Sequence, residues 1–298
     1  MFKYFFRPKK LDTNYRQAWV FGMSNNSLWS PRKLNTQEHG FHILKKQTIA
    51  SVITSGFVGF LPFFIFLFPL YELNLEFYKY HVVYLLCTIY SIFLWLHCII
   101  RESEVGFHTL QVQRGLLAGF FMFILSEVMF FFSVFWAFFY FSLDPTVWLG
   151  CKWPPYDLKI WNVFTLPTLN TIILLLSGVT VTLAHQAIIL GERLDSLTAL
   201  LLTVVLGVEF TLCQVFEYTH IQLQINESVF GSIFFFSTGF HGLHVFIGTL
   251  FLSVCLFEHF NYKTLMDQHV GLECAIWYWH FVDVVWLFLF VFIYFLGT

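Results

Sequence analysis

Residues 115–142 read GLLAGFFMFILSEVMFFFSVFWAFFYFS, and this apolar run decides the class of fold. Glu127 is the one charged side chain in the run. At 1.5 Å per residue, a helix of this length extends about 42 Å, which exceeds the ~30 Å hydrocarbon core of a bilayer. The stretch therefore predicts a helix that crosses a membrane.

The rest of the chain repeats this pattern. Hydrophobic residues make up 58% of the sequence and charged residues only 11%, whereas soluble domains carry about 25% charged residues. We predict an all-α polytopic membrane protein with seven transmembrane helices, joined by loops too short to hold a soluble domain. A net charge of −2 indicates no nucleic-acid partner. The other six predicted spans are 47–70, 80–100, 166–190, 197–219, 229–257 and 272–297.

Basic residues predict the orientation of these spans. Residues 1–46 hold nine of the 16 lysines and arginines, and seven spans place this segment on the same side as Arg101, Arg114, Arg193 and Lys263. The opposite side holds only Lys79, Lys152 and Lys159. Because basic residues concentrate on the cytoplasmic side of membrane proteins, we expect the N-terminus on that side, which is the matrix in a mitochondrion. Residues 1–37 are interpreted as a retained basic arm rather than a transit peptide.

Three acidic residues are expected near the bilayer midplane. Insertion scales assign about 2.5–3.5 kcal/mol to a charged Asp at that depth. We therefore expect Glu127, Glu209 and Asp283 to face the bundle interior, to pair with one another or to stay protonated. For Glu127, a structural role and a proton-related role both stay open. His280 lies three residues before Asp283, so the two could form a hydrogen bond along one helix face.

Two histidines, His241 and His244, also lie at mid-depth and three residues apart. One helix could present both to a metal or a haem. Packing is favoured, because no third ligand has a suggestive spacing and the six cysteines form no CxxC motif. The sequence also lacks the P-loop, GxSxG and HExxH motifs of soluble enzymes.

Five stretches in order resemble subunit III of the haem–copper cytochrome c oxidases, from about His39 to the C-terminus. The loop at 153–155, Trp-Pro-Pro, is also similar to that family. The stretches are SEVMFF at 126–131 with FWAFF at 135–139, LNT at 169–171, SGV at 177–179 with AH at 184–185, GFHGLHV at 239–245, and WYWHFVDVVW at 277–286.

The resemblance implies a two-helix and a five-helix bundle with a lipid-filled cleft between them. It implies a subunit of a proton-pumping oxidoreductase that packs beside subunit I, has no catalytic residue, binds no haem, copper or other metal itself, and holds structural phospholipids. The family associates this subunit with stability of the complex, resistance to inactivation during turnover and efficient proton uptake into subunit I. Glu127 matches the family's membrane-buried carboxylate and is the proton-related candidate. Arg101, Glu102 and His108 match positions that bind phospholipid head groups. The implied location is the mitochondrial inner membrane, with a bacterial plasma membrane as the alternative.

The sequence departs from the family at three places. Residues 1–37 form an extension to the domain at 38–298, Phe107 replaces a histidine found in many relatives, and Glu209 stands where relatives usually carry a neutral residue. We expect Glu209 to pair with a polar group on a neighbouring span or on another subunit. Alternative functions are a quinol oxidase subunit III, a proton-coupled transporter, and a redox-carrying subunit that uses His241 and His244.

Overall fold

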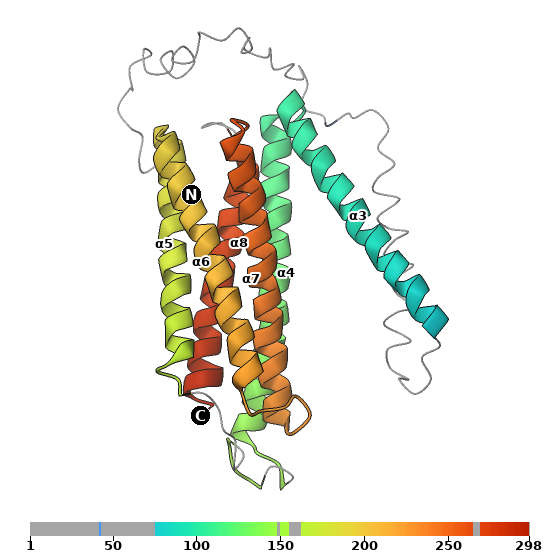
Figure 1. Ribbon diagram of the computed structural model, residues 1–298, viewed down its shortest axis with the longest axis vertical. Helices are drawn as coiled ribbons and strands as arrows, with labels where there is room; N and C mark the ends of the chain where they lie inside the picture. Colours follow the sequence, from blue (N-terminus) through green and yellow to red (C-terminus); the bar gives the residue numbers. More distant parts are fainter. Residues whose placement is uncertain (1–41, 43–74, 148–149, 155–161, 265–268, 298) are drawn as a thin grey trace. The chain divides into compact units, whose positions relative to one another are not determined.

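The computed structural model describes residue 42 and residues 75–147, 150–154, 162–264 and 269–297. Every regular element in these ranges is helical, as Figure 1 shows, which confirms the all-α prediction for the described part of the chain. The chain divides into two units, Met1–Thr109 and Leu110–Thr298.

In the first unit, the described helix is α3, Leu75–Val105, which covers the predicted span at 80–100. The helix ends at Gly106, whose φ of +90° lies in the left-handed region that glycine adopts without steric cost. The predicted span at 47–70 and the arm at 1–37 lie outside the described residues. The seven-helix count and the two-helix bundle therefore stay predictions.

The second unit contains five helices that are long and apolar enough to cross a membrane, counted among the described residues. They confirm the five predicted spans from residue 115 onward, with ends that differ by a few residues. The helices are α4 (Leu110–Leu143), α5 (Leu166–Leu190), α6 (Arg193–His220), α7 (Val229–Phe260) and α8 (Val270–Leu289), which continues into the π-helical turn η3 (Phe290–Phe295).

Local sequence explains where several of these helices begin and end. Pro167 stands in the first turn of α5, where its missing N–H leaves no helical bond unmade. Gly191, at φ +82°, ends the same helix and donates its N–H to the carbonyl of Ile188. At the start of α7, the Ser228 hydroxyl accepts a hydrogen bond from the Gly231 N–H.

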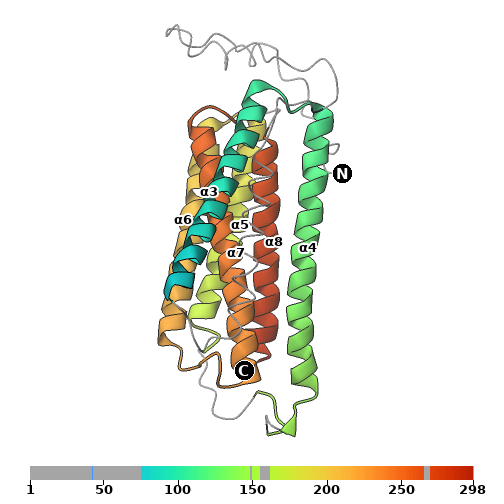
Figure 2. The ribbon, with the colours of Figure 1, turned by 90° about the vertical axis from the view of Figure 1, so that its right-hand side faces the viewer.

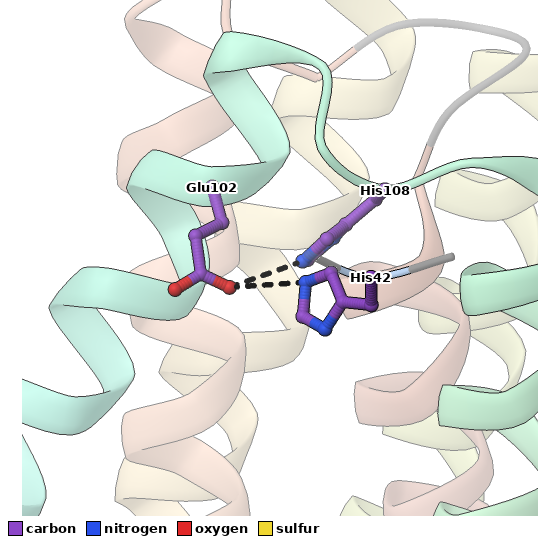
Figure 3. A group of neighbouring side chains, drawn as sticks. All are labelled: His42, Glu102 and His108. Carbon is purple, nitrogen blue, oxygen red and sulfur yellow. Dashed lines mark ion pairs between the residues drawn. The ribbon is translucent and has the colours of Figure 1, made fainter. Parts of the chain in front are cut away.

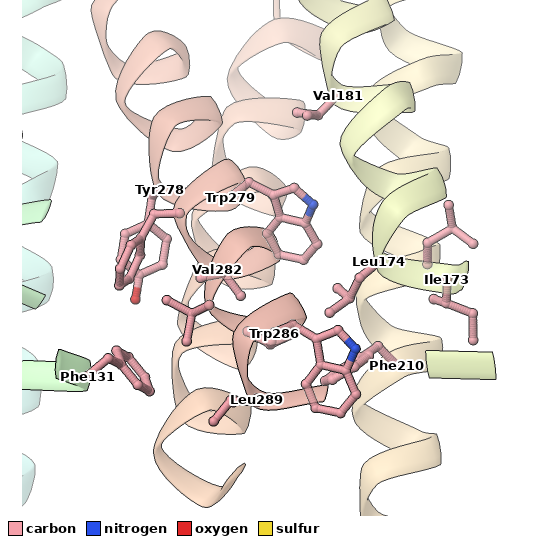
Figure 4. Packing of buried hydrophobic residues seen from close by; sticks show 14 of the residues in the cluster. Phe131, Ile173, Leu174, Val181, Phe210, Tyr278, Trp279, Val282, Trp286 and Leu289 are labelled. Carbon is pink, nitrogen blue, oxygen red and sulfur yellow. The ribbon is translucent and has the colours of Figure 1, made fainter. Parts of the chain in front are cut away.

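Helix α8 forms the centre of the five-helix unit and contacts α4, α5 and α7. Its two buried tryptophans face α5 and α6, while Tyr278 faces the opposite side (Figure 4). The Trp279 indole N–H donates to the Ser177 hydroxyl at 2.9 Å, and the Trp286 N–H donates to Thr171 at 3.0 Å. Since apolar side chains gain little by leaving lipid, such interhelical hydrogen bonds and close packing hold the bundle together.

Helix α4 lies at the edge of the five-helix unit, as Figure 2 shows. Phe131, Val134 and Phe138 are its buried side chains, and the two phenylalanines belong to the hydrophobic core shared with the other helices of the unit. Its remaining surface is largely apolar and exposed in the isolated chain, which suits contact with lipid or with another membrane protein.

Candidate functional site

Glu127 of α4 and His244 of α7 form a mid-depth pair. The Glu127 Oε2 atom lies 2.8 Å from the His244 Nε2 atom, and both side chains are largely buried. Phe131 packs edge-on against the imidazole, and the ring of Tyr278 stacks over it. The structure thus places the predicted proton-related carboxyl next to a titratable partner on another helix.

The hydrogen bonds of His244 fix how many protons this pair holds. Its Nδ1 lies 2.7 Å from the Phe240 carbonyl oxygen, which can only accept, so Nδ1 must carry a proton and donate it. One further proton then lies between Nε2 and the Glu127 carboxyl, either on the oxygen or on the nitrogen. The pair can therefore exchange a proton internally without a change of net charge.

His241 has different partners from those of His244. Its Nε2 lies 3.2 Å from the carbonyl oxygen of Val282, and its ring packs against Phe210 and Trp286 in the bundle interior. Since His244 points instead towards Glu127, the two histidines do not converge on a common point.

His280 and Asp283 do not form the hydrogen bond that their spacing allowed. His280 Nε2 lies 3.4 Å from the Thr182 hydroxyl of α5 instead. Asp283 is buried against Gly178, where an added Cβ would lie 2.6 Å from the Asp283 Oδ2 atom. Within the described ranges, Asp283 Oδ1 has no hydrogen-bond partner. Both residues thus contact α5, as inward-facing polar groups should.

The prediction that Glu209 is buried is wrong, because its side chain is exposed in the isolated chain. The reason is its angular position on α6, where the neighbouring Gly207 and Phe210 take the inward-facing positions. Glu217, a fully buried acid in the last turns of the same helix, was not among the predicted site residues. The position of Glu217 near the end of an apolar run was the sequence signal that could have identified it as a candidate site residue.

A second cluster lies within the first unit, where the end of α3 meets the following turn. Glu102 Oε2 lies 3.4 Å from His42 Nε2 and 3.9 Å from His108 Nε2 (Figure 3). Glu102 and His108, both predicted as lipid contacts, are therefore brought together. Arg101 is exposed one residue before Glu102. His42 was missed as a site residue, because nothing in the sequence shows that it lies beside a residue 60 positions away.

Burial controls the protonation of this second cluster, which lies beyond the predicted span at 80–100. Burial lowers the pKa of the His108 imidazole, and the neighbouring His42 lowers this pKa further. Burial also raises the pKa of the Glu102 carboxyl, an effect that His42 partly offsets. Burial therefore makes both groups harder to ionise, His108 as a cation and Glu102 as an anion.

Among the described residues, two groups of side chains have ligand atoms close enough for one metal ion. In the cluster of His42, Glu102 and His108, these atoms lie within 4.8 Å of one another. The same holds for His185 of α5 with His269 and Glu273 at the start of α8. Each group joins residues from distant parts of the sequence, so ligand spacing did not reveal either of them.

Comparison with known proteins gives a consistent result. Residues 39–298 match the family described as "Cytochrome c oxidase subunit III". The chain is 53% identical to cytochrome c oxidase subunit 3 of Schizophyllum commune over 211 residues, which cover 70% of this chain and 79% of the relative. It is 44% identical to the Neurospora crassa protein of the same name over 273 residues, or 89% of this chain and 97% of the relative.

Proposed function

This chain belongs to the cytochrome c oxidase subunit III family, and from that premise we propose that it is a non-catalytic core subunit of the mitochondrial terminal oxidase, complex IV. In this role it packs against subunit I, which carries the redox chemistry from cytochrome c to oxygen with proton pumping. The observation that carries the proposal is the family match over residues 39–298, which contains all five membrane-spanning helices of the second unit.

The absence of a redox centre from this chain is part of the proposal. The mid-depth histidines are the residues whose sequence spacing suggested ligation of haem or copper, and both have protein partners. His241 bonds to the Val282 carbonyl and His244 lies between Glu127 and the Phe240 carbonyl. Ligation by His244 would require it to give up a hydrogen bond inside a low-dielectric bundle, because both of its ring nitrogens have partners.

A role in proton uptake is supported by the pair of Glu127 and His244. Its shared proton can move between carboxyl and imidazole, and Glu127 is partly accessible at the edge of the bundle. We assign Glu127 the part of a proton-holding group that supports uptake into subunit I. It is a positioning and buffering residue rather than a catalytic one.

Phospholipid binding is supported by the residues at the end of α3. Arg101 is exposed, and the partly buried Glu102 and His108, which lie close to each other, follow it in the chain. A guanidinium binds a phosphate oxygen pair with two parallel hydrogen bonds, and a neutral His can add a third. These residues suit a phospholipid head group on the matrix side of the inner membrane, where basic-residue bias places this loop.

The variant Glu127→Gln tests the proton-related part of the proposal. A carboxamide can still donate a hydrogen bond to His244 Nε2, so packing is retained, but it cannot release a proton. We expect intact haem content with a modest change in proton uptake or in the rate of inactivation during turnover.

The matched control is Ser126→Ala, because the Ser126 hydroxyl bonds only to the Phe123 carbonyl of its own helix. Loss of assembled haem in Glu127→Gln, but not in the control, would make Glu127 a structural residue and refute the proton-related role.

A further inference from the structure

Glu209 occupies the outward face of α6. The inward face carries Ser196, Thr203 and Gly207, which are buried and follow the helical repeat. Glu209 lies two residues after Gly207, or about 200° further around the helix. Its neighbours on that face are the exposed aliphatic residues Val205 and Leu212, 52% and 64% accessible in the chain alone.

This acid lies at a depth where a bilayer contains no water. From the helix ends at Arg193 and His220, Glu209 is about 24 Å and about 16 Å away along the axis, so it sits inside the ~30 Å hydrocarbon layer. A long side chain could reach the interface from the end of a helix, but Glu cannot do so from this depth.

No group on the described part of the chain neutralises Glu209. It makes neither a hydrogen bond nor an ion pair there. The other two mid-depth acids behave differently, since Glu127 contacts His244 and Asp283 is buried against α5. An outward ionised carboxylate in an aliphatic surface is therefore expected to find a complementary charge beyond the described residues.

We propose that a transmembrane helix of another oxidase subunit covers this face of α6 and presents a Lys, Arg or His side chain to Glu209. The aliphatic residues on both sides of Glu209 supply the packing surface, and the ion pair fixes the depth and rotation of the partner helix. Unpaired, each charge is costly in lipid, so the pair favours the assembled complex over the separate subunits. The inference rests on the proposed place of the chain in the oxidase.

The test uses the intact oxidase, with a photo-crosslinking amino acid at Val205 or Leu212, one turn from Glu209 on either side. We expect a crosslink to one transmembrane segment of another subunit, with a basic residue at the matching depth. Crosslinks to lipid alone, or to a second copy of this chain, would overturn the proposal.

Charge variants provide the second measurement. Glu209→Lys should lower retention of the crosslinked subunit during detergent washing by roughly tenfold or more, because like charges then face each other. Glu209→Gln should lower it less, since an amide can still accept a hydrogen bond. Asp195→Asn is the matched control, an exposed acid in the first turn of the same helix. Equal retention in Glu209→Lys and the control would also overturn the proposal.

The same preparations separate this inference from the proposed function. Haem content and oxidase activity that copurify with the chain report its membership in the complex. If the chain copurifies with the oxidase but Glu209 contacts only lipid, the proposed interface is refuted and the proposed function stands. If the chain does not copurify with oxidase, the proposed function fails and the inference fails with it.

Discussion

The packing of Trp279 makes Gly207→Ala the most informative single substitution. A Cβ at Gly207 would lie 2.8 Å from the Trp279 Cη2 atom and 2.7 Å from the Thr249 Oγ1 atom, both closer than side-chain contacts allow. The ring cannot retreat, because Ser177 holds its N–H and Gly248 closes its other side, where a Cβ would lie 3.0 Å from Cε3. Thr249 is likewise held by its bond to the Val245 carbonyl.

The expected cost follows from these two fixed neighbours. Overpacking a filled interior costs about 1–3 kcal/mol, while Gly→Ala in a helix gains up to ~1 kcal/mol of intrinsic propensity. Gly119→Ala is the matched control, because a Cβ there meets no atom within 4 Å. The propensity gain is common to both variants, so their difference isolates the packing cost of about 1–3 kcal/mol.

The assay is thermal release or unfolding of the chain in purified oxidase. At roughly 2–4 °C per kcal/mol for a unit of this size, Gly207→Ala should melt about 2–12 °C below Gly119→Ala. Equal midpoints for the two variants would show that α6 does not pack on Trp279 as described.

Three further predictions concern other contacts. Trp279→Phe removes an interhelical hydrogen bond in the bundle interior and should destabilise the chain by about 0.6–1.7 kcal/mol in the same thermal assay. Trp136→Phe is the control, and its destabilisation should be near zero because Trp136 is exposed. His108 should keep a neutral imidazole to a lower pH than an ordinary histidine, since its pKa is lowered by burial, and His42→Gln should raise that pKa in histidine-selective NMR. Arg101→Gln should reduce the phospholipid retained per complex, measured by mass spectrometry of the delipidated oxidase, because a bidentate phosphate contact is lost.

Each of these predictions has an outcome that contradicts it. Equal melting midpoints for the two tryptophan variants would show that the hydrogen bond from Trp279 to Ser177 does not stabilise the chain. A midpoint for His108 at or above the ordinary ~6.5 would contradict its burial beside His42. Arg114→Gln is the control for the lipid measurement, as a second exposed arginine at the start of α4, and equal lipid loss in both variants would refute a specific head-group contact at Arg101.

The helices of the second unit could be predicted from the sequence, because the bilayer requires long apolar runs and the chain marks their ends with charge, proline or glycine. The run at 166–190 agrees with the bounds of α5. Contacts between helices could not be predicted, since one sequence shows no register between spans. Glu127 and His244 are 117 residues apart, and their pairing depends on how α4 and α7 are rotated.

The orientation of Glu209 was available in the sequence but was missed. Polar and small residues on α6 recur at Ser196, Thr203, Gly207 and Gln214, spacings of seven, four and seven, and all four are buried. This repeat marks the inward face of the helix. Glu209 falls outside it, so its exposure follows from helical geometry and needs no knowledge of the neighbouring helices.

The most direct test of the central claim is the location of the redox centres. Haem and copper are measured per oxidase before and after this chain is removed from the purified complex with detergent, and in the released chain itself. We expect unchanged haem and copper in the depleted complex, no haem absorbance in the released chain, and faster loss of activity during turnover. Haem or copper that leaves with the chain would contradict its assignment as a non-catalytic subunit.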